Sequence, residues 1–324
     1  MHVAPSRPVS SLPRIRRVLT LPPHHHHYHH HHHHHARVAT ATFLEQLCGL
    51  GNKVSPVTKA LRCQKAEHTF ADTPCGIMDQ YISAMGKEKN LLLIDCRSQE
   101  YTLVPFASSD RAPVVLVTNS NVKHTLSGSE YPDRVRQCRE AVAAIAKKHP
   151  NVSALRDCNM EMLDSVKSKL SAVNYNRARH CIKEDARTLA TVRALREGDY
   201  KSVGRFMTES HNSLQHDFEV SCAELDTLVE LALKVEGVYG SRMTGGGFGG
   251  CTVTLVEREA VGRLKQYLKE NFPLCECYEA VPSSGANVAD PVENKSASWW
   301  DWLPLAAAAA AAVALVAIVV ARRK

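Results

Sequence analysis

The sequence lacks any pair of cysteines at C-x-x-C spacing, although eleven cysteines are spread along its 324 residues. Structural zinc sites commonly use such pairs, and only Cys275 and Cys277 lie close together, which is a weak metal signal. We therefore predict no metal site. Scattered cysteines are typical of small buried thiols in a reducing compartment, so we expect a cytoplasmic protein.

Acidic residues are absent from residues 1–23, which are rich in Pro, Ser and Arg. This composition resembles that of a targeting peptide, but its prolines would interrupt an amphipathic helix. Residues 24–35 are histidines interrupted only by Tyr28. Because such a run has no apolar face to bury, we expect residues 1–37 to form a disordered segment.

The formal net charge of +7 is concentrated near the two ends of the chain, and the middle is closer to balance. A surface for nucleic acid is therefore not predicted. The content of 44% hydrophobic and 23% charged residues is that of a globular protein. A chain of this length holds about two domains, and we find no internal repeat.

Hydrophobic periodicity predicts helices that flank antiparallel strands, which is an α+β architecture. Structure is expected from Val38, and Ser55 and Pro56 are the N-cap and first residue of a helix that ends near Phe70. Glu67 and His68, late in that helix, are interpreted as a solvated pair. Further helices are predicted over about 131–148, 177–195, 201–217, 225–231 and 259–270. Strands are predicted over 91–95, 101–105, 113–118, 251–256 and 274–280.

The stretch Thr73–Gln80 combines a Pro and a Gly with an apolar run at helical spacing. It predicts a loop that leads into a helix with Asp79 in the first turn. The N-terminus of a helix presents free N–H groups that favour negative charge, as of a carboxylate or a phosphate. Asp79 could therefore accept a proton from a hydroxyl beside a phosphate. The alternative is an ordinary acidic residue in a first helical turn.

Five glycines lie between Gly245 and Gly250. Each would lose backbone entropy inside a helix or strand, so Gly240–Cys251 is predicted to be a loop whose backbone can approach a ligand closely. The alternative is a flexible surface loop. A second, polar loop is predicted over Asn119–His124, directly after a buried strand, where ligand contacts are common.

These motifs resemble those of the GHMP small-molecule kinases, and within them the galactokinases more than the N-acetylgalactosamine kinases. Gly76–Gln80 and Ser241–Cys251 carry the resemblance, and Leu93–Ser98, Thr118–Val122 and Arg177–His180 agree with it in order. The resemblance covers about residues 38–288. It implies a truncated two-domain GHMP fold, with a remnant of the N-terminal domain over 38–112 and a ferredoxin-like C-terminal domain over 113–288.

The resemblance implies phosphoryl transfer from ATP, with Mg²⁺, to the anomeric hydroxyl of galactose, giving galactose 1-phosphate. By the family pattern Asp79 is the catalytic carboxylate, and Gly76, Asp79 and Tyr131 contact galactose. Lys123 stands where the family often carries Arg near the nucleotide phosphates, and Lys keeps the charge but loses the bidentate fork. The glycine loop would close over the sugar and the phosphates with Gly245, Gly246 and Gly247.

Two features of that family are not found before the helix that starts near Val38. One is an early motif with Arg, Glu, His and Asp that grips the sugar, and the other is a Gly/Ser-rich loop that holds the phosphates. Without them we expect ATP affinity to fall, the sheet of Leu91–Asp95 to lose its other strands, and activity to be poor or absent. The alternatives are a non-catalytic galactose-binding or regulatory protein and a membrane-tethered interaction protein.

The last part of the chain differs in kind from the rest. Residues 289–302 are interpreted as a linker that ends in three tryptophans, and Leu303–Ala321 is uncharged and followed by three basic residues. As a helix this stretch would span roughly 28 Å, close to the thickness of a bilayer core. We therefore predict a transmembrane helix over 303–321 that anchors the protein to a membrane. A soluble hydrophobic tail is the alternative.

Overall fold

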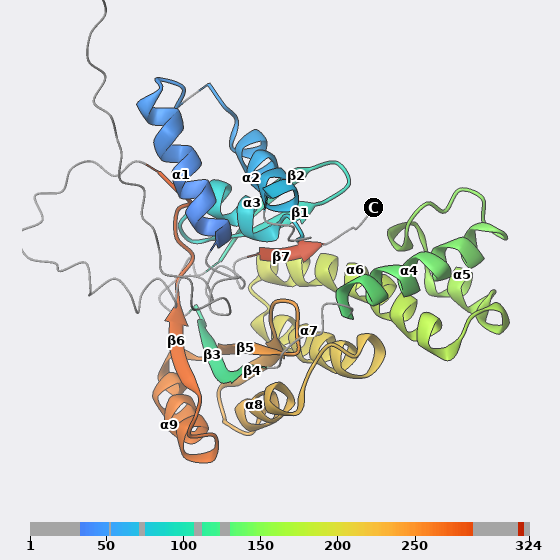
Figure 1. Cartoon of the computed structure of the whole chain (residues 1–324). Helices are drawn as coiled ribbons and strands as arrows, with labels where there is room; N and C mark the ends of the chain where they lie inside the picture. The colour runs from blue at the N-terminus through green and yellow to red at the C-terminus, as the bar shows by residue number, and fades with distance from the viewer. Residues whose placement is uncertain are drawn as a thin grey trace, which may run out of the picture. The chain divides into compact units, whose positions relative to one another are not determined.

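The computed structural model describes residues 33–51, 53–70, 75–106, 112–123, 130–287 and 317–320 (Figure 1). Three helices come first, and the strands β1 (Asn90–Asp95) and β2 (Glu100–Pro105) follow them. The cap predicted for the second helix is confirmed, since the Thr58 N–H donates to Ser55 Oγ at 3.1 Å. The helices are α1 (His33–Leu47), α2 (Pro56–Phe70) and α3 (Met78–Met85).

The first helix begins earlier than the predicted start at Val38. Arg37 was assigned to the disordered segment, but it lies in α1 and its guanidinium is 3.2 Å from the carboxylate of Glu67 on α2. That contact, together with the complete burial of Val38, ties the first turns of α1 to the rest of the chain. The helix therefore extends into a sequence with no apolar face of its own, because contacts with residues distant in the sequence stabilise it.

A three-stranded sheet has the order β2-β1-β7, in which β7 is Ala317–Val320. β1 and β2 form an antiparallel hairpin, whereas β7 runs parallel to β1 with Leu92 opposite Ala317. We expected β1 to lose the other strands of its sheet, but β7 pairs with one of its edges. Figure 1 shows β7 beside β1 and close to α6 (Ala172–Glu197), which it contacts.

The prediction of a helix over 303–321 is wrong for Ala317–Val320, because these residues form a strand. A β-rich apolar sequence next to an unpaired strand edge gains ladder hydrogen bonds that a lone helix in water cannot offer. The rest of that predicted helix and the three tryptophans lie outside the described residues. Among the described residues, no helix has the length and apolar content needed to cross a membrane.

The second sheet is antiparallel with the order β4-β5-β3-β6. β4 was not predicted, because Gly240–Met243 was taken as part of the glycine loop. Gly240 has a packing role inside the strand. A Cβ at this position would lie 1.9 Å from the carbonyl oxygen of Gly204, which belongs to α7 (Tyr200–Ser213). The strands are β3 (Val114–Lys123), β4 (Val238–Met243), β5 (Gly249–Val256) and β6 (Glu276–Ala280).

The two faces of this sheet are covered by different helices. Val115 and Val117 of β3 belong to a core that also contains residues of α3, β1 and α7 (Tyr200–Ser213). The alternate residues Val114 and Leu116 pack with α8 (Ala223–Leu233) and α9 (Val261–Asn271) on the opposite face. The period of two along a strand produces this division, and the predicted arrangement of helices flanking antiparallel strands is confirmed for this sheet.

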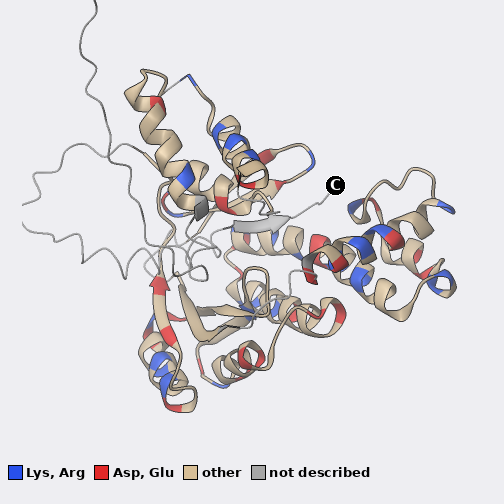
Figure 2. Cartoon of the chain, viewed as in Figure 1, with Lys and Arg blue, Asp and Glu red and all other residues tan. Residues whose placement is uncertain are grey.

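A helical region connects β3 to β4 through α4 (Glu130–Ala146), α5 (Met160–Asp164), α6, α7 and α8. Basic and acidic residues lie side by side along α4, α5 and α6 (Figure 2). α6 ends at Gly198, which has a φ of +71°, and α7 continues into the π-helix η3 (Leu214–Phe218). The remaining short 3₁₀ turns are η1 (Leu155–Asp157), η2 (Lys167–Lys169) and η4 (Arg258–Ala260).

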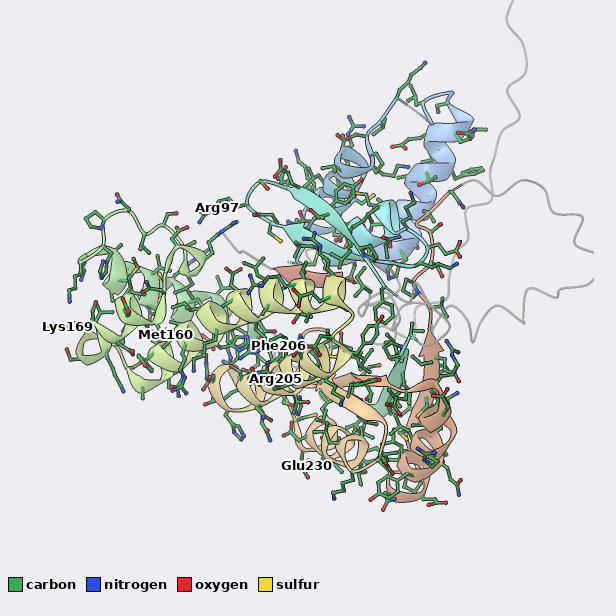
Figure 3. All side chains as sticks on the ribbon, turned by 180° about the vertical axis from the view of Figure 1, so that it is seen from behind. Arg97, Met160, Lys169, Arg205, Phe206 and Glu230 are labelled. Carbon is green, nitrogen blue, oxygen red and sulfur yellow. The ribbon has the colours of Figure 1, made fainter. Side chains whose placement is uncertain are left out.

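Two ion pairs join the β1–β2 hairpin to η1. Arg97 extends from the hairpin (Figure 3), and its guanidinium lies 2.7 Å from the carboxylate of Asp157. In the second pair, Arg156 of η1 donates to both carboxylate oxygens of Asp95 at the end of β1, at 2.7 and 2.9 Å. The hydrogen bonds from Arg156 hold the pKa of the Asp95 carboxyl well below its usual range.

Candidate active site

Asp79 lies in the first turn of α3, as predicted, and is partly buried. Ile77 occupies the N-cap position of this helix and provides no side-chain hydrogen bond to the first N–H groups. The first N–H groups of a helix carry partial positive charge. Asp79 therefore stands at a helix end that suits an anionic group.

The loop that leads into α3 is held by side chains of α2. The Cys75 carbonyl accepts a hydrogen bond from Gln64 Nε2 at 3.2 Å, and the Cys75 N–H donates to His68 Nε2 at 3.2 Å. Glu67 is fully buried and accepts a hydrogen bond from Gln80 Nε2 at 3.0 Å. The interpretation of Glu67 and His68 as a solvated pair is therefore wrong for Glu67, and both residues fix the segment that carries Gly76 and Asp79.

The thiol of Cys75 lies within this arrangement, 3.5 Å from Glu67 Oε2. Burial and then the Glu67 carboxylate raise the pKa of the Cys75 thiol to about 11. The thiol therefore stays protonated near neutral pH and is a poor nucleophile. Next to it, Gly76 is exposed, and a Cβ added there would meet no atom of the described residues within 4 Å. Packing does not require glycine at this position, so its predicted contact with a sugar stays a prediction.

The structure brings Lys123 next to the glycine loop. The β3–β5 ladder runs to Asn119 opposite Cys251, and after an irregularity Lys123 pairs with Gly249. The Ser120 hydroxyl strengthens the junction by donating to the Gly250 carbonyl at 2.8 Å. The polar loop predicted over Asn119–His124 is thus strand as far as Lys123, because its backbone continues to pair with β5 beyond the apolar run.

The glycine loop connects β4 to β5, and its core, residues 244–248, is a turn as predicted. Gly247 adopts a φ of +89°, and a Cβ there would lie only 2.0 Å from the Val220 carbonyl oxygen. Only glycine fits both requirements at this position. Phe248 follows in the same left-handed region with a φ of +59°.

The structure describes the remaining predicted contact residues only in part. Tyr131 is the second residue of α4, and its side chain lies outside the described part of the structure. Ile77 and Met78 at the start of α3 pack against the same core as Cys251 of β5, at the exit of the glycine loop. The start of α3 and the end of the glycine loop thus share one core, whereas a cleft between Asp79 and Gly246 stays a prediction.

Comparison with known proteins shows which protein family the chain resembles. A family model described as the C-terminal domain of GHMP kinases matches residues 191–274, which include the glycine loop. Human galactokinase is 52% identical over 235 residues, which are 72% of this chain and 58% of the human protein. The chain is therefore similar to the galactokinases of the GHMP kinase family. Galactokinase from Chloroflexus aggregans agrees, with 46% identity over 222 residues, 68% of this chain and 55% of that protein.

A solved structure of a galactokinase supports the same assignment. Lactococcus lactis galactokinase complexed with galactose matches this chain with a TM-score of 0.73 and 29% identity. The match covers 79% of this chain and 66% of the lactococcal chain. The resemblance drawn from the motifs and the mixed helix-and-sheet GHMP fold are thereby confirmed. The chain spans somewhat more than half of the length of the relatives it matches.

Proposed function

We propose that this chain binds galactose and transfers the γ-phosphoryl group of ATP to its anomeric hydroxyl. The observation that carries the proposal is the 52% identity to human galactokinase over 235 residues. The position of Asp79 in the first turn of α3 and of Lys123 beside Gly249 agrees with it. Gly76, Asp79 and Tyr131 contact the sugar, and Lys123 with Gly245, Gly246 and Gly247 faces the phosphates.

Each of these residues has a simple task in the proposed reaction. The Asp79 carboxylate accepts the proton of the anomeric hydroxyl, a contribution of typically ~10²–10⁴-fold for a general base. The Lys123 ammonium and the backbone N–H groups of the glycine loop balance the negative charge on the transferred group. The rest of the rate enhancement comes from holding the sugar and the phosphate in line.

We further propose that ATP binds weakly to this chain. Directly before α1 the sequence is a histidine run and not a Gly/Ser-rich loop whose N–H groups could hold phosphates. Among the described residues, no three His, Cys, Asp or Glu side chains form a group that could hold a metal ion. Mg²⁺ therefore enters as the companion of the ATP phosphates, where it neutralises charge, and no protein residue is assigned to it.

Calorimetry with galactose and with a non-hydrolysable ATP analogue tests the proposal. Galactose binding that is lost in Asp79→Asn but kept in Asp133→Asn, an exposed carboxylate on α4, is the expected result. Slow galactose 1-phosphate formation that rises with ATP concentration without saturating would accompany it. Binding of galactose without any phosphorylation would instead favour a galactose-binding regulatory protein, and binding of neither ligand would overturn both functions.

A further inference from the structure

We propose that Arg134 and Arg177 are positioning residues that hold the glycine loop in place through the segment Leu214–Val220, which we call the supporting turn. The supporting turn consists of the π-helix η3 and the two residues after it. A π-helix is uncommon and is frequently found near functional sites. The use of the glycine loop in catalysis rests on the proposed function, whereas the mechanical connection stands on the contacts below.

Arg134 reaches the supporting turn from α4. Its Nε donates to the Phe218 carbonyl and one terminal nitrogen donates to the Glu219 carbonyl, both at 2.7 Å. These carbonyls lie at the end of the π-helix, where backbone acceptors lack helical partners. Arg134 is only 8% exposed, and its charge faces these two carbonyl dipoles and the Glu130 carboxylate, 3.7 Å away.

Arg177 reaches the same turn from α6. One terminal nitrogen donates to the Asp217 carbonyl and the other to the Glu219 carboxylate, both at 2.6 Å, and its Nε donates to Gln137 at 3.1 Å. Arg177 is 2% exposed. Glu219 itself has a φ of +52°, a left-handed conformation that is unfavourable for a side chain with a Cβ. Three consecutive residues, Asp217 to Glu219, are thus fixed by two buried guanidinium groups.

The supporting turn in turn holds the glycine loop. The Phe248 N–H donates to the Val220 carbonyl at 2.8 Å, and Gly247 lies so close to the same carbonyl that no Cβ fits. The Phe248 side chain packs against a small core that contains Leu214, Val220 and Met243. The loop backbone is therefore attached to the turn by a hydrogen bond, a tight contact and an apolar contact.

The arrangement also links the loop to the helix that carries the predicted sugar contact. Tyr131 lies three residues before Arg134, so the first two turns of α4 carry both the predicted sugar contact and the anchor of the loop support. A planar guanidinium can bond two carbonyls at once, which a lysine ammonium on a flexible stem cannot do with the same geometry. Replacement of either arginine by lysine should therefore keep the charge and release the turn.

Hydrogen–deuterium exchange of peptides that cover residues 244–251 tests the connection without any requirement for kinase activity. In Arg134→Lys, exchange in this loop is expected to be about tenfold faster, while peptides of α9 and β6 are unchanged. Arg177→Lys should act in the same way. Arg136→Lys is the matched control, because Arg136 lies on the same helix with a side chain that is 58% exposed.

A second variant acts from the loop side. Gly247→Ala leaves both arginines intact and places a methyl group against Val220, so it should speed exchange in the same peptides. Unchanged loop exchange in folded Arg134→Lys and Arg177→Lys proteins would overturn the proposal. Galactose affinity separates this result from a failure of the proposed function: we expect it to fall about tenfold in Arg134→Lys but not in Arg136→Lys. If no galactose binds to either protein, the function fails while the exchange data still decide the connection.

Discussion

The His180 side chain is buried, and its pKa differs from that of a histidine in water. Its Nδ1 lies 3.0 Å from the Ser213 hydroxyl, and its ring stacks on Phe218 of the supporting turn with 4.6 Å between the ring centres. Burial lowers the pKa of this imidazole to about 4, despite the opposing influence of the Glu184 carboxylate. The native protein therefore keeps a neutral ring at a pH where the same ring in the unfolded chain takes up a proton.

This difference predicts a loss of stability in mild acid. Because the native pKa is below the unfolded value near 6.5, the contribution of His180 is complete above pH 6.5 and falls as the pH decreases toward 4. Between pH 7 and pH 5 the free energy of unfolding should fall by about 2 kcal/mol through this group. Urea unfolding of the native protein and of His180→Gln at both pH values measures it, since the variant should lose that part of the pH dependence.

His149→Gln serves as the control for the loss of a histidine elsewhere in the chain. Equal pH dependence of the native protein and the His180→Gln variant would contradict the prediction.

Single residues also show what the sequence can predict. Asp79 was placed correctly in a first helical turn, because Pro, Gly and helical spacing act locally. The burial of Glu67 was missed, since its compensating partner Arg37 is 30 residues away in a segment without apolar periodicity. The network of Arg134 and Arg177 was missed for the same reason: neither position differs in local pattern from a solvated arginine on a helix.

At the scale of elements, the contact of α7 with β4 depends on two glycines. A Cβ at Gly204 would lie 2.0 Å from the Tyr239 carbonyl oxygen, and one at Gly240 would meet the backbone of Gly204. Both obstacles are backbone atoms, which cannot move aside by changing a rotamer. The helix and the strand therefore approach each other at a distance that only this pair of residues allows.

Gly204→Ala should accordingly destabilise the protein by about 1–3 kcal/mol or more, as expected for overpacking. Thermal and urea unfolding would measure the change. Gly262→Ala on α9 is the matched control, because a Cβ there meets no atom within 4 Å and alanine favours a helix by ~0.5–1 kcal/mol. A Gly204→Ala protein as stable as the parent would disprove the close contact.

The positions of several long periodic elements were predicted well, whereas β4 and the end of β3 were not. α2, α4, α9 and β1 agree with the predicted ranges to within a few residues. β4 was missed because Gly240 weakens a strand pattern, although tertiary contact with α7 requires it. β3 is longer than predicted because pairing with β5 continues through polar residues, a cause that no window of local sequence contains.

At the scale of the whole molecule, the sheet of β1 depends on a strand from far along the chain. The pairing of Leu92 to Asp95 with Ala317–Val320 covers one edge of β1. An uncovered edge offers unpaired backbone groups to other molecules. The predicted domain boundary near residue 112 stays a prediction, since one hydrophobic core contains residues from both sides of it.

A protein that ends at residue 302 should therefore be less stable and should associate. We expect a loss of about 2 kcal/mol or more, because each ladder hydrogen bond contributes ~0.5–1.5 kcal/mol. Light scattering and urea unfolding would detect both effects. A protein that ends at residue 320 keeps β7 and is the control; equal behaviour of the two proteins would show that β7 does not protect the edge.

The parallel pairing of β1 with β7 has a consequence for biosynthesis. β1 leaves the ribosome more than 200 residues before its partner, so during most of translation its edge is open while the helices and the second sheet already form. Closing this sheet is a late step that joins two strands more than 200 residues apart in the sequence, and it should be slow for the same reason that all non-local strand pairing is slow. Chaperone dependence during synthesis is therefore expected to concentrate on the hairpin of β1 and β2, long after that hairpin has been made.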